Sequence, residues 1–189
     1  MRRRRPGAPA GARRRARLLA PAVALAALAA AVAAAPGAAP VPGTPLRPLA
    51  GLDTTSGRAV YEANCAGCHG FTGEGLRGAV PPLAGNVLVL LAREGGREYL
   101  VGVLLTGLSG EIEVLGERYD GVMPSWAHLG EAQVADVLNH VATAWGNAAL
   151  LPPDAVEFTD LEVGMARAFP ADQAALARMR RTLARPSEQ

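Results

Sequence analysis

Apolar residues in this chain recur at helical spacing. Over residues 131–145 they form a single stripe, at i, i+3, i+4, i+7 and i+11, made by Val134, Val137, Leu138, Val141 and Trp145. This spacing predicts an amphipathic helix with one buried face. Gly130 before the stripe and Gly146 after it occupy positions typical of helix ends.

Shorter patterns predict the other elements. A first helix is expected over residues 56–66, because the hydroxyl residues Thr54 to Ser56 are suited to cap its start. Alternation over residues 111–114, between two glycines, predicts a short hairpin arm. The remaining helical patterns cover residues 87–92, 96–106, 160–168 and 171–184, the last two separated at Pro170.

The N-terminus has the organisation of an export signal. Arginines concentrated in residues 2–17 precede an apolar run over residues 18–35, an order typical of secretory signal peptides. Small residues at Ala31 and Ala33 predict cleavage before Ala34. The alternative is an uncleaved membrane tether through residues 18–35, since a run of about 18 residues is near the lower limit for a span. Both alternatives place the rest of the chain in the periplasm or on the outer face of the cytoplasmic membrane.

The chain is acidic after its arginine-rich N-terminus, although its total net charge is positive. The 189-residue chain has a formal net charge of +2, but eight of its 19 basic residues lie within residues 2–17. The sequence after Arg17 therefore carries a net charge of −6, and residues 53–149 carry 11 acidic residues against five arginines. Nucleic-acid binding needs cations clustered on the folded surface. This distribution argues against a nucleic-acid partner.

One motif carries specific chemistry. Cys65-Ala66-Gly67-Cys68-His69 is the C-x-x-C-H sequence to which c-type haem is attached. Two thiols at this spacing can form thioethers with both vinyl groups at one haem edge, and the adjacent imidazole then lies under the iron. The motif predicts one covalent haem c attached through Cys65 and Cys68, with His69 as an iron ligand.

Three other roles for the cysteine pair are less consistent with the sequence. A thioredoxin-like C-x-x-C requires a βαβ context that residues 56–69 do not show. Zinc binding usually takes four ligands, and the chain has no second Cys/His pair at suitable spacing. A structural disulfide is the third alternative, and the histidine after Cys68 together with the export signal favours haem over it.

An iron that only carries electrons needs a ligand on its second face. The candidates are Met123, Met165, Met179, His128 and His140. We favour Met123, since Pro124 stiffens its loop and favours an extended conformation that presents the thioether. Met165 and Met179 lie in helical patterns of the tail, and His140 is expected inside a helix, facing away from its apolar stripe.

These features together resemble the class I c-type cytochromes, small monohaem proteins with His/Met-ligated iron. The match covers about residues 53–149 and comprises the C-x-x-C-H motif with Gly70, Pro81-Pro82-Leu83-Ala84-Gly85, Met123-Pro124 and the last amphipathic helix. The resemblance implies an all-α cytochrome c fold, with several short helices around one haem. It also implies that the carbonyl of Pro81, or alternatively that of Pro82, accepts a hydrogen bond from the ring of His69, as a ligating histidine requires.

In the resembled family the first and last helices cross. The resemblance therefore implies that Gly57 and Tyr61 meet Val137, Val141 or Trp145. Glycine destabilises a helix relative to alanine, so Gly57 fits a position where the partner helix comes close.

The implied domain organisation has four parts. These are a signal peptide or anchor (1–35), a Pro/Gly-rich linker (36–52), a haem domain (53–149) and a helical C-terminal extension (150–189). Over residues 144–147, 158–163 and Arg167, the extension is similar to that of cytochrome subunits of bacterial membrane dehydrogenases. A clasp that packs on the haem domain is the preferred role for it, and an arm that docks to another subunit is the second.

His/Met ligation, as implied by the resemblance, leaves no iron position for a substrate. The expected function is that of a one-electron carrier in a bacterial respiratory chain, not an enzyme. The alternative is the electron-accepting cytochrome c subunit of a periplasmic or membrane dehydrogenase. A haem enzyme or gas sensor would instead need a vacant or labile sixth position.

Charge and aromatic residues add expectations about the surroundings of the haem. The acidic domain predicts a redox partner with a basic docking face. Tyr119 and Trp126 flank the methionine loop and are expected to pack on the haem. Candidate partners for a haem propionate are Arg58, Arg77, Arg93, Arg97 and Arg118.

Overall fold

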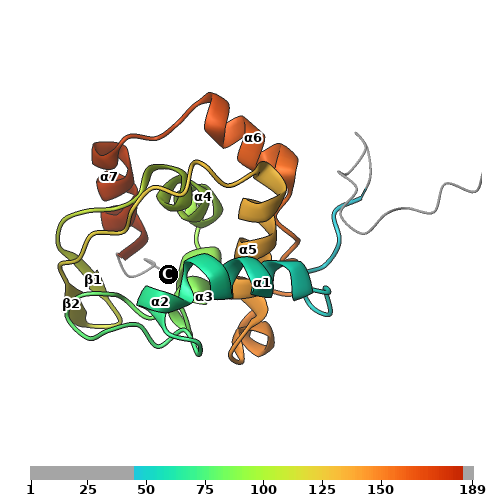
Figure 1. Cartoon of the computed structure of the whole chain (residues 1–189), viewed down its shortest axis with the longest axis horizontal. Coiled ribbons are helices and arrows are strands. Elements are labelled where there is room, and N and C mark those ends of the chain that lie inside the picture. Colours follow the sequence, from blue (N-terminus) through green and yellow to red (C-terminus); the bar gives the residue numbers. More distant parts are fainter. Residues whose placement is uncertain (1–44, 185–189) are drawn as a thin grey trace, which may run out of the picture. The chain divides into compact units, whose positions relative to one another are not determined.

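The structure, a computed structural model, describes residues 45–184. The predicted signal peptide or anchor, residues 1–35, lies outside this part, as do residues 36–44. In the described part no helix combines the length and apolar character needed to cross a membrane. Its elements are α1 (Thr55–Asn64), α2 (Ala66–His69), α3 (Asn86–Leu91), α4 (Gly96–Thr106), β1 (Ile112–Val114), β2 (Glu117–Tyr119), α5 (Glu131–Thr143), a 3-10 turn (Asn147–Leu150), α6 (Asp160–Ala168) and α7 (Gln173–Ala184) (Figure 1).

The mostly helical architecture agrees with the sequence prediction, and the hairpin is its only sheet in the described residues. β1 and β2 pair antiparallel, with Ile112 opposite Tyr119 and Val114 opposite Glu117. The prediction of a hairpin arm is therefore confirmed, and helix 96–106 has the predicted bounds.

The first and last predicted helices pack against each other as α1 and α5 (Figure 1). A Cβ atom added to Gly57 would lie 1.9 Å from the backbone oxygen of Asp136, so only glycine allows this approach. The Tyr61 ring lies 5.0 Å from that of Trp145 and 5.6 Å from that of His140, centroid to centroid. The expected contact of Tyr61 with Trp145 is confirmed. Gly57 faces Asp136 and His140 instead of an apolar residue of the stripe.

His140 corrects one expectation. We predicted that it faces away from the apolar stripe of its helix, but it is half-buried and its ring contacts those of Tyr61 and Trp145, at centroid distances of 5.6 and 5.7 Å. The α1–α5 contact explains the difference, because α1 covers a face of α5 that the apolar stripe alone does not mark. Burial lowers the pKa of His140.

Replacement of Gly57 by alanine is expected to destabilise the folded protein by about 1–3 kcal/mol or more, because the added methyl group must displace backbone and not a flexible side chain. The measurement is the free energy of unfolding in denaturant. Gly164→Ala in α6 is the matched control, since its Cβ would meet only Glu131 Cγ at 3.9 Å. The control should be neutral or slightly stabilised, since alanine favours a helix by up to about 1 kcal/mol over glycine. Equal effects of both substitutions would contradict the close approach.

The ends of the two crossing helices differ from prediction. The hydroxyls of Thr54 to Ser56 do not cap α1: Thr54, at the N-cap, makes no side-chain cap bond. The carboxylate of Asp53 accepts hydrogen bonds from Thr55 N and Thr55 Oγ1 instead, at 3.0 and 2.7 Å. α5 ends at Thr143, and Trp145 lies beyond it with a φ of +53°.

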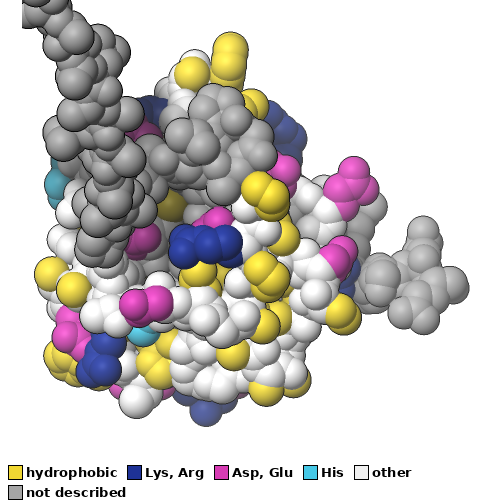
Figure 2. All heavy atoms as spheres, turned by 90° about the vertical axis from the view of Figure 1, so that its right-hand side faces the viewer, with side chains coloured by type: hydrophobic (Ala, Val, Ile, Leu, Met, Phe, Trp, Pro, Cys, Tyr) yellow, Lys and Arg dark blue, Asp and Glu magenta, His cyan; other side chains and the backbone are white. Residues whose placement is uncertain are grey.

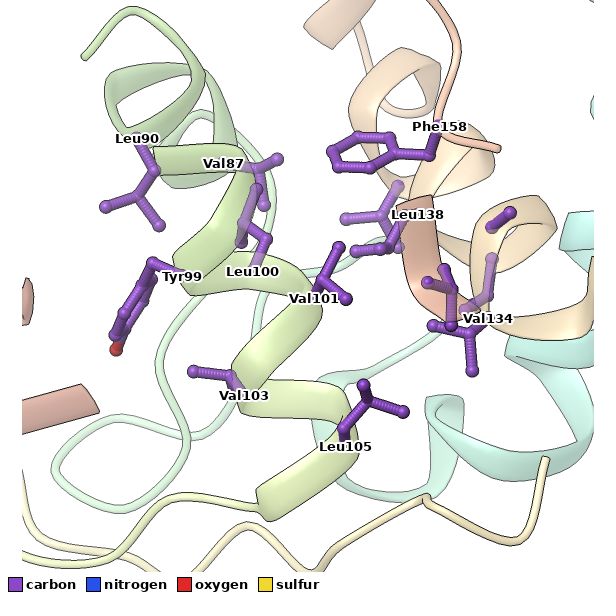
Figure 3. Close-up of a cluster of buried hydrophobic side chains, with 14 of the residues drawn as sticks. Val87, Leu90, Tyr99, Leu100, Val101, Val103, Leu105, Val134, Leu138 and Phe158 are labelled. Carbon is purple, nitrogen blue, oxygen red and sulfur yellow. The ribbon is translucent and has the colours of Figure 1, made fainter. Parts of the chain in front are cut away.

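α4 has two buried faces that serve different purposes. Figure 3 shows Val101 and Leu105 directed toward Leu138, Val134 and Phe158, on one side of the helix. Tyr99 and Val103, with Leu90 of α3, point to the other side. The first side is a conventional apolar core. The second side forms the wall of a pocket.

The C-terminal helices are part of the core. Val163 of α6 and Leu176 of α7 are fully buried, and Leu183 is 4% exposed. α6 packs on α5, and α7 packs on α4 and β1. The extension thus contributes to the same hydrophobic cluster as α4 and α5.

The chain before α1 pairs with the chain before α6. Leu49 is fully buried, and its N–H donates to the carbonyl of Ala155 at 3.0 Å. Arg47 Nε and Nη2 both donate to Oε2 of Glu157, at 2.8 and 2.5 Å. Residues 47–49, which lie within the predicted linker (36–52), are therefore held on the folded body.

Candidate functional site

A single pocket gathers the residues that the sequence singled out. Cys65, Cys68, His69, Pro81 and Met123 all line it. The rest of its wall is mostly apolar and comes largely from α3, α4, the hairpin and the methionine loop, with one residue from α7. Its empty volume, which includes the opening to solvent, is about 1010 Å³.

The C-x-x-C-H motif is held by a short helix and two aromatic anchors. The motif occupies Cys65 and α2, which follows α1 directly. The hydroxyl of Tyr61 donates to the carbonyl of Gly70 at 2.6 Å, and Trp145 Nε1 donates to the carbonyl of Phe71 at 3.0 Å. The α1–α5 contact therefore fixes the chain immediately after His69.

The imidazole of His69 has a defined tautomer. The side chain is buried, and Nδ1 lies 3.2 Å from the carbonyl oxygen of Pro81. A carbonyl can only accept, so the proton is on Nδ1 and Nε2 keeps its lone pair for a metal. Burial lowers the pKa of His69, and the Pro81 hydrogen bond opposes this. The contact is with Pro81, whereas Pro82 does not line the pocket.

Met123 is positioned by the C-terminal end of α4. Its N–H donates to the carbonyl of Leu108 at 2.8 Å and its carbonyl accepts from Leu108 N at 3.0 Å. Gly107 has a φ of +76°, and a Cβ there would lie 2.6 Å from Met123 O. Ser125 Oγ donates to the carbonyl of Leu105 at 2.6 Å. Main-chain bonds on both sides of Met123 thus hold this loop against the pocket.

The two cysteines are free thiols in the structure. Burial, with a smaller contribution from Cys68, raises the pKa of Cys65 to about 11. Redox-active cysteines act as thiolates and usually have a lowered pKa, so this environment does not favour the thioredoxin-like alternative. Within residues 45–184, no group of three or more His, Cys, Asp or Glu residues is arranged to hold a metal ion.

The other candidates for the sixth ligand lie elsewhere. Met165 is 62% exposed, Met179 packs on the core cluster, and His128 is exposed beside Trp126. None of these residues, nor His140, is among those that line the pocket. Tyr119 and Trp126 do line it, in agreement with their expected place beside the haem.

The arginines predicted as propionate partners do not line the pocket either. Arg58 pairs with Glu62, Arg77 with Glu117, Arg97 with Glu162, and Arg118 lies 3.9 Å from Glu111. Arg97 also stacks over the Phe158 ring at 4.0 Å. The Arg58–Glu62 pair lies within α1, one turn apart. The Arg77–Glu117 and Arg97–Glu162 pairs join segments that are distant in the sequence, so the sequence did not reveal them.

Arg180 is the pocket residue that sequence reasoning missed. It lies on α7, is 8% exposed and lines the same pocket as His69 and Met123. A signal was present, since Arg180 stands at i+4 in the apolar stripe that Leu176 begins and Leu183 continues. An arginine on the buried stripe of a helix indicates a partner for its charge.

The residues present fit a haem. The pocket is apolar, has attachment thiols and a neutral buried imidazole on one wall, and has a thioether on another. In addition, the buried Nε of Arg180 has no hydrogen-bond partner within the described part of the chain. An anionic carboxylate within the pocket would supply that partner.

Comparisons with known proteins agree with this site. Residues 52–141 match the family described as "Cytochrome C oxidase, cbb3-type, subunit III". The chain is 60% identical over 92 residues to a cytochrome c-552 of Thermus thermophilus, covering 49% of this chain and 70% of that protein. A second Thermus thermophilus cytochrome c-552 is 58% identical over 97 residues, covering 51% of this chain and 65% of that protein.

A more distant relative is the cytochrome c subunit of a quinone-dependent alcohol dehydrogenase from Gluconobacter oxydans. It is 33% identical over 111 residues, which cover 57% of this chain and 21% of that subunit. The similarity therefore concerns one part of a longer protein. Taken with the C-x-x-C-H pocket, these matches identify the chain as a member of the class I c-type cytochromes, electron-transfer proteins with one covalent haem c.

Proposed function

We propose that His69 and Met123 ligate the haem iron from opposite faces, and that the protein is a one-electron carrier in a bacterial respiratory chain. The observation that carries this proposal is the composition of the pocket. Among the methionines and histidines considered for the sixth position, Met123 alone joins His69 in the pocket wall. The haem supplies one-electron exchange between ferrous and ferric iron.

The residues of the chain have distinct roles in this proposal. Cys65 and Cys68 attach the cofactor, and the carbonyl of Pro81 holds the imidazole of His69 in one orientation by accepting a hydrogen bond from its Nδ1–H. Met123 raises the reduction potential, because a thioether ligand favours ferrous iron. Apolar side chains from α3 and α4 exclude water from the pocket, which limits solvent reorganisation when the charge changes. With both iron faces occupied, no substrate binds.

The spectrum of the purified wild-type protein tests this proposal. We expect a haem c spectrum in alkaline pyridine, the weak near-infrared absorption of thioether-ligated ferric haem, and no change when carbon monoxide is added to the reduced protein. A His/Met-ligated c-type cytochrome and a haem protein with a vacant sixth position are suitable references for a closed and an open iron. Rapid carbon monoxide binding by the native protein would contradict His/Met ligation.

The partner that we propose is a dehydrogenase or oxidase with a basic docking face. Residues 53–149 carry six more acidic than basic residues, and on the face in Figure 2 the few basic side chains lie among acidic and apolar ones. Opposite charge on a partner would accelerate association, and salt would weaken the effect. The proposed location is the periplasm or the outer membrane face, with residues 18–35 as a cleaved signal or a tether.

The similarity to a dehydrogenase cytochrome c subunit favours a second candidate function, electron acceptance within such a complex. The two candidates differ in the strength of association. Stable co-purification with a large dehydrogenase from membranes would favour the subunit, and recovery as a free protein would favour the carrier.

A further inference from the structure

Arg180 is a buried cation in an apolar pocket. It projects from α7, where Leu176 and Leu183 on the same stripe are 0% and 4% exposed. Both neighbouring arginines on the helix, Arg178 and Arg181, are exposed. α7 thus directs one of its three arginines inward, although burying a charge is costly unless a partner compensates it.

The protein itself satisfies only part of the guanidinium. Arg180 Nη2 donates to the backbone carbonyl of Glu113 at 2.6 Å. Its Nε is buried and has no hydrogen-bond partner among residues 45–184. The described residues that line the pocket include no aspartate or glutamate, and the side chain of Glu113 is exposed. A buried donor left without an acceptor destabilises the folded protein, and more so when it is charged.

We propose that Arg180 is the charge partner of a haem propionate, so that the C-terminal extension forms part of the cofactor site. The proposal rests on the haem-binding function of this pocket. The haem brings two carboxylates, which are the kind of group that the Arg180 fork pairs with. Four arginines of residues 53–149 pair instead with acidic residues that do not line the pocket. Arg180 therefore lies in the pocket wall and has an unpaired N–H donor, as a propionate partner requires.

The electrostatic environment of Arg180 agrees with this role. Burial lowers the pKa of Arg180, which signals a desolvated charge. Burial raises the pKa of Tyr99, which lines the same pocket, and Arg180 opposes this shift. Tyr99 is thus a neutral phenol and does not compensate the guanidinium. A cation beside the haem also stabilises the ferrous state relative to the ferric state, which has one more positive charge.

The experiment uses the full-length holoprotein and its Arg180→Gln variant, at a pH where propionates are ionised. We expect Arg180→Gln to lower the reduction potential. In the redox-difference infrared spectrum, the propionate bands, identified by carbon-13 labelling of the haem, should shift. Arg181→Gln is the matched control, since it removes the same charge from the next, exposed position of α7. The control should leave both measurements at their wild-type values.

A conservative variant keeps the proposal testable if Arg180→Gln matures poorly. Arg180→Lys retains the charge but not the fork, so it should keep most of the potential while the propionate bands shift. Wild-type potential and wild-type bands in Arg180→Gln would overturn the proposal, as would unchanged bands in Arg180→Lys. Failure of the proposed ligation is distinguishable, because it would alter the iron spectrum of the wild-type protein itself.

Discussion

Replacement of Met123 by alanine is expected to leave haem c attached but to open the iron to carbon monoxide. Attachment depends on Cys65 and Cys68. Neither cysteine makes a backbone hydrogen bond to the loop that carries Met123. Loss of the thioether removes a ligand that favours ferrous iron. We expect the reduction potential to fall by on the order of 0.1 V, a modest share of the roughly 0.8 V over which axial ligands set haem potentials.

The measurements for this variant are carbon monoxide difference spectra and potentiometric titration. Met165→Ala is the matched control, because Met165 is 62% exposed on α6 and does not line the pocket. It should bind no carbon monoxide and keep the wild-type potential. An Met123→Ala protein that still refuses carbon monoxide would show that another residue is the sixth ligand.

Replacement of His69 by alanine is expected to abolish the mature holoprotein. His69 is buried against the attachment site, and its orientation is fixed by Pro81 O at 3.2 Å. Loss of an outer partner alone typically weakens metal binding by about 10- to 100-fold, so loss of the ligand itself should exceed that effect. The apolar pocket, lined in part by α3 and α4, would then be left without a cofactor.

Haem staining of denaturing gels, compared with the amount of exported chain, measures this effect. His128→Ala is the control, since His128 is exposed and lies outside the pocket wall. It should mature normally. A His69→Ala protein with normal yield and an unchanged iron spectrum would contradict the assignment of His69.

Local pattern was sufficient for most elements. The α4 and α6 bounds agree with prediction, and the hairpin follows from alternation between two glycines. The errors occur at ends and contacts. Trp145 continues the apolar stripe of α5 in sequence but leaves the helix in space, because packing on Tyr61 and the bond to Phe71 O hold it there. Periodicity records which side of a helix is buried, but not where tertiary contacts end the helix.

The sequence by itself determined the attachment chemistry, since two thiols and an imidazole at C-x-x-C-H spacing form a local unit whose geometry needs no distant residue. It also marked Met123 through the adjoining proline. Only the tertiary structure decided that Pro81 and not Pro82 contacts His69. It also placed Arg180, from a helix more than a hundred residues after the motif, in the same pocket. The reason is that the burial of a charged side chain depends on which segments pack together in the folded protein. The spacing of residues along the sequence predicts such packing only for segments that are close together in the chain.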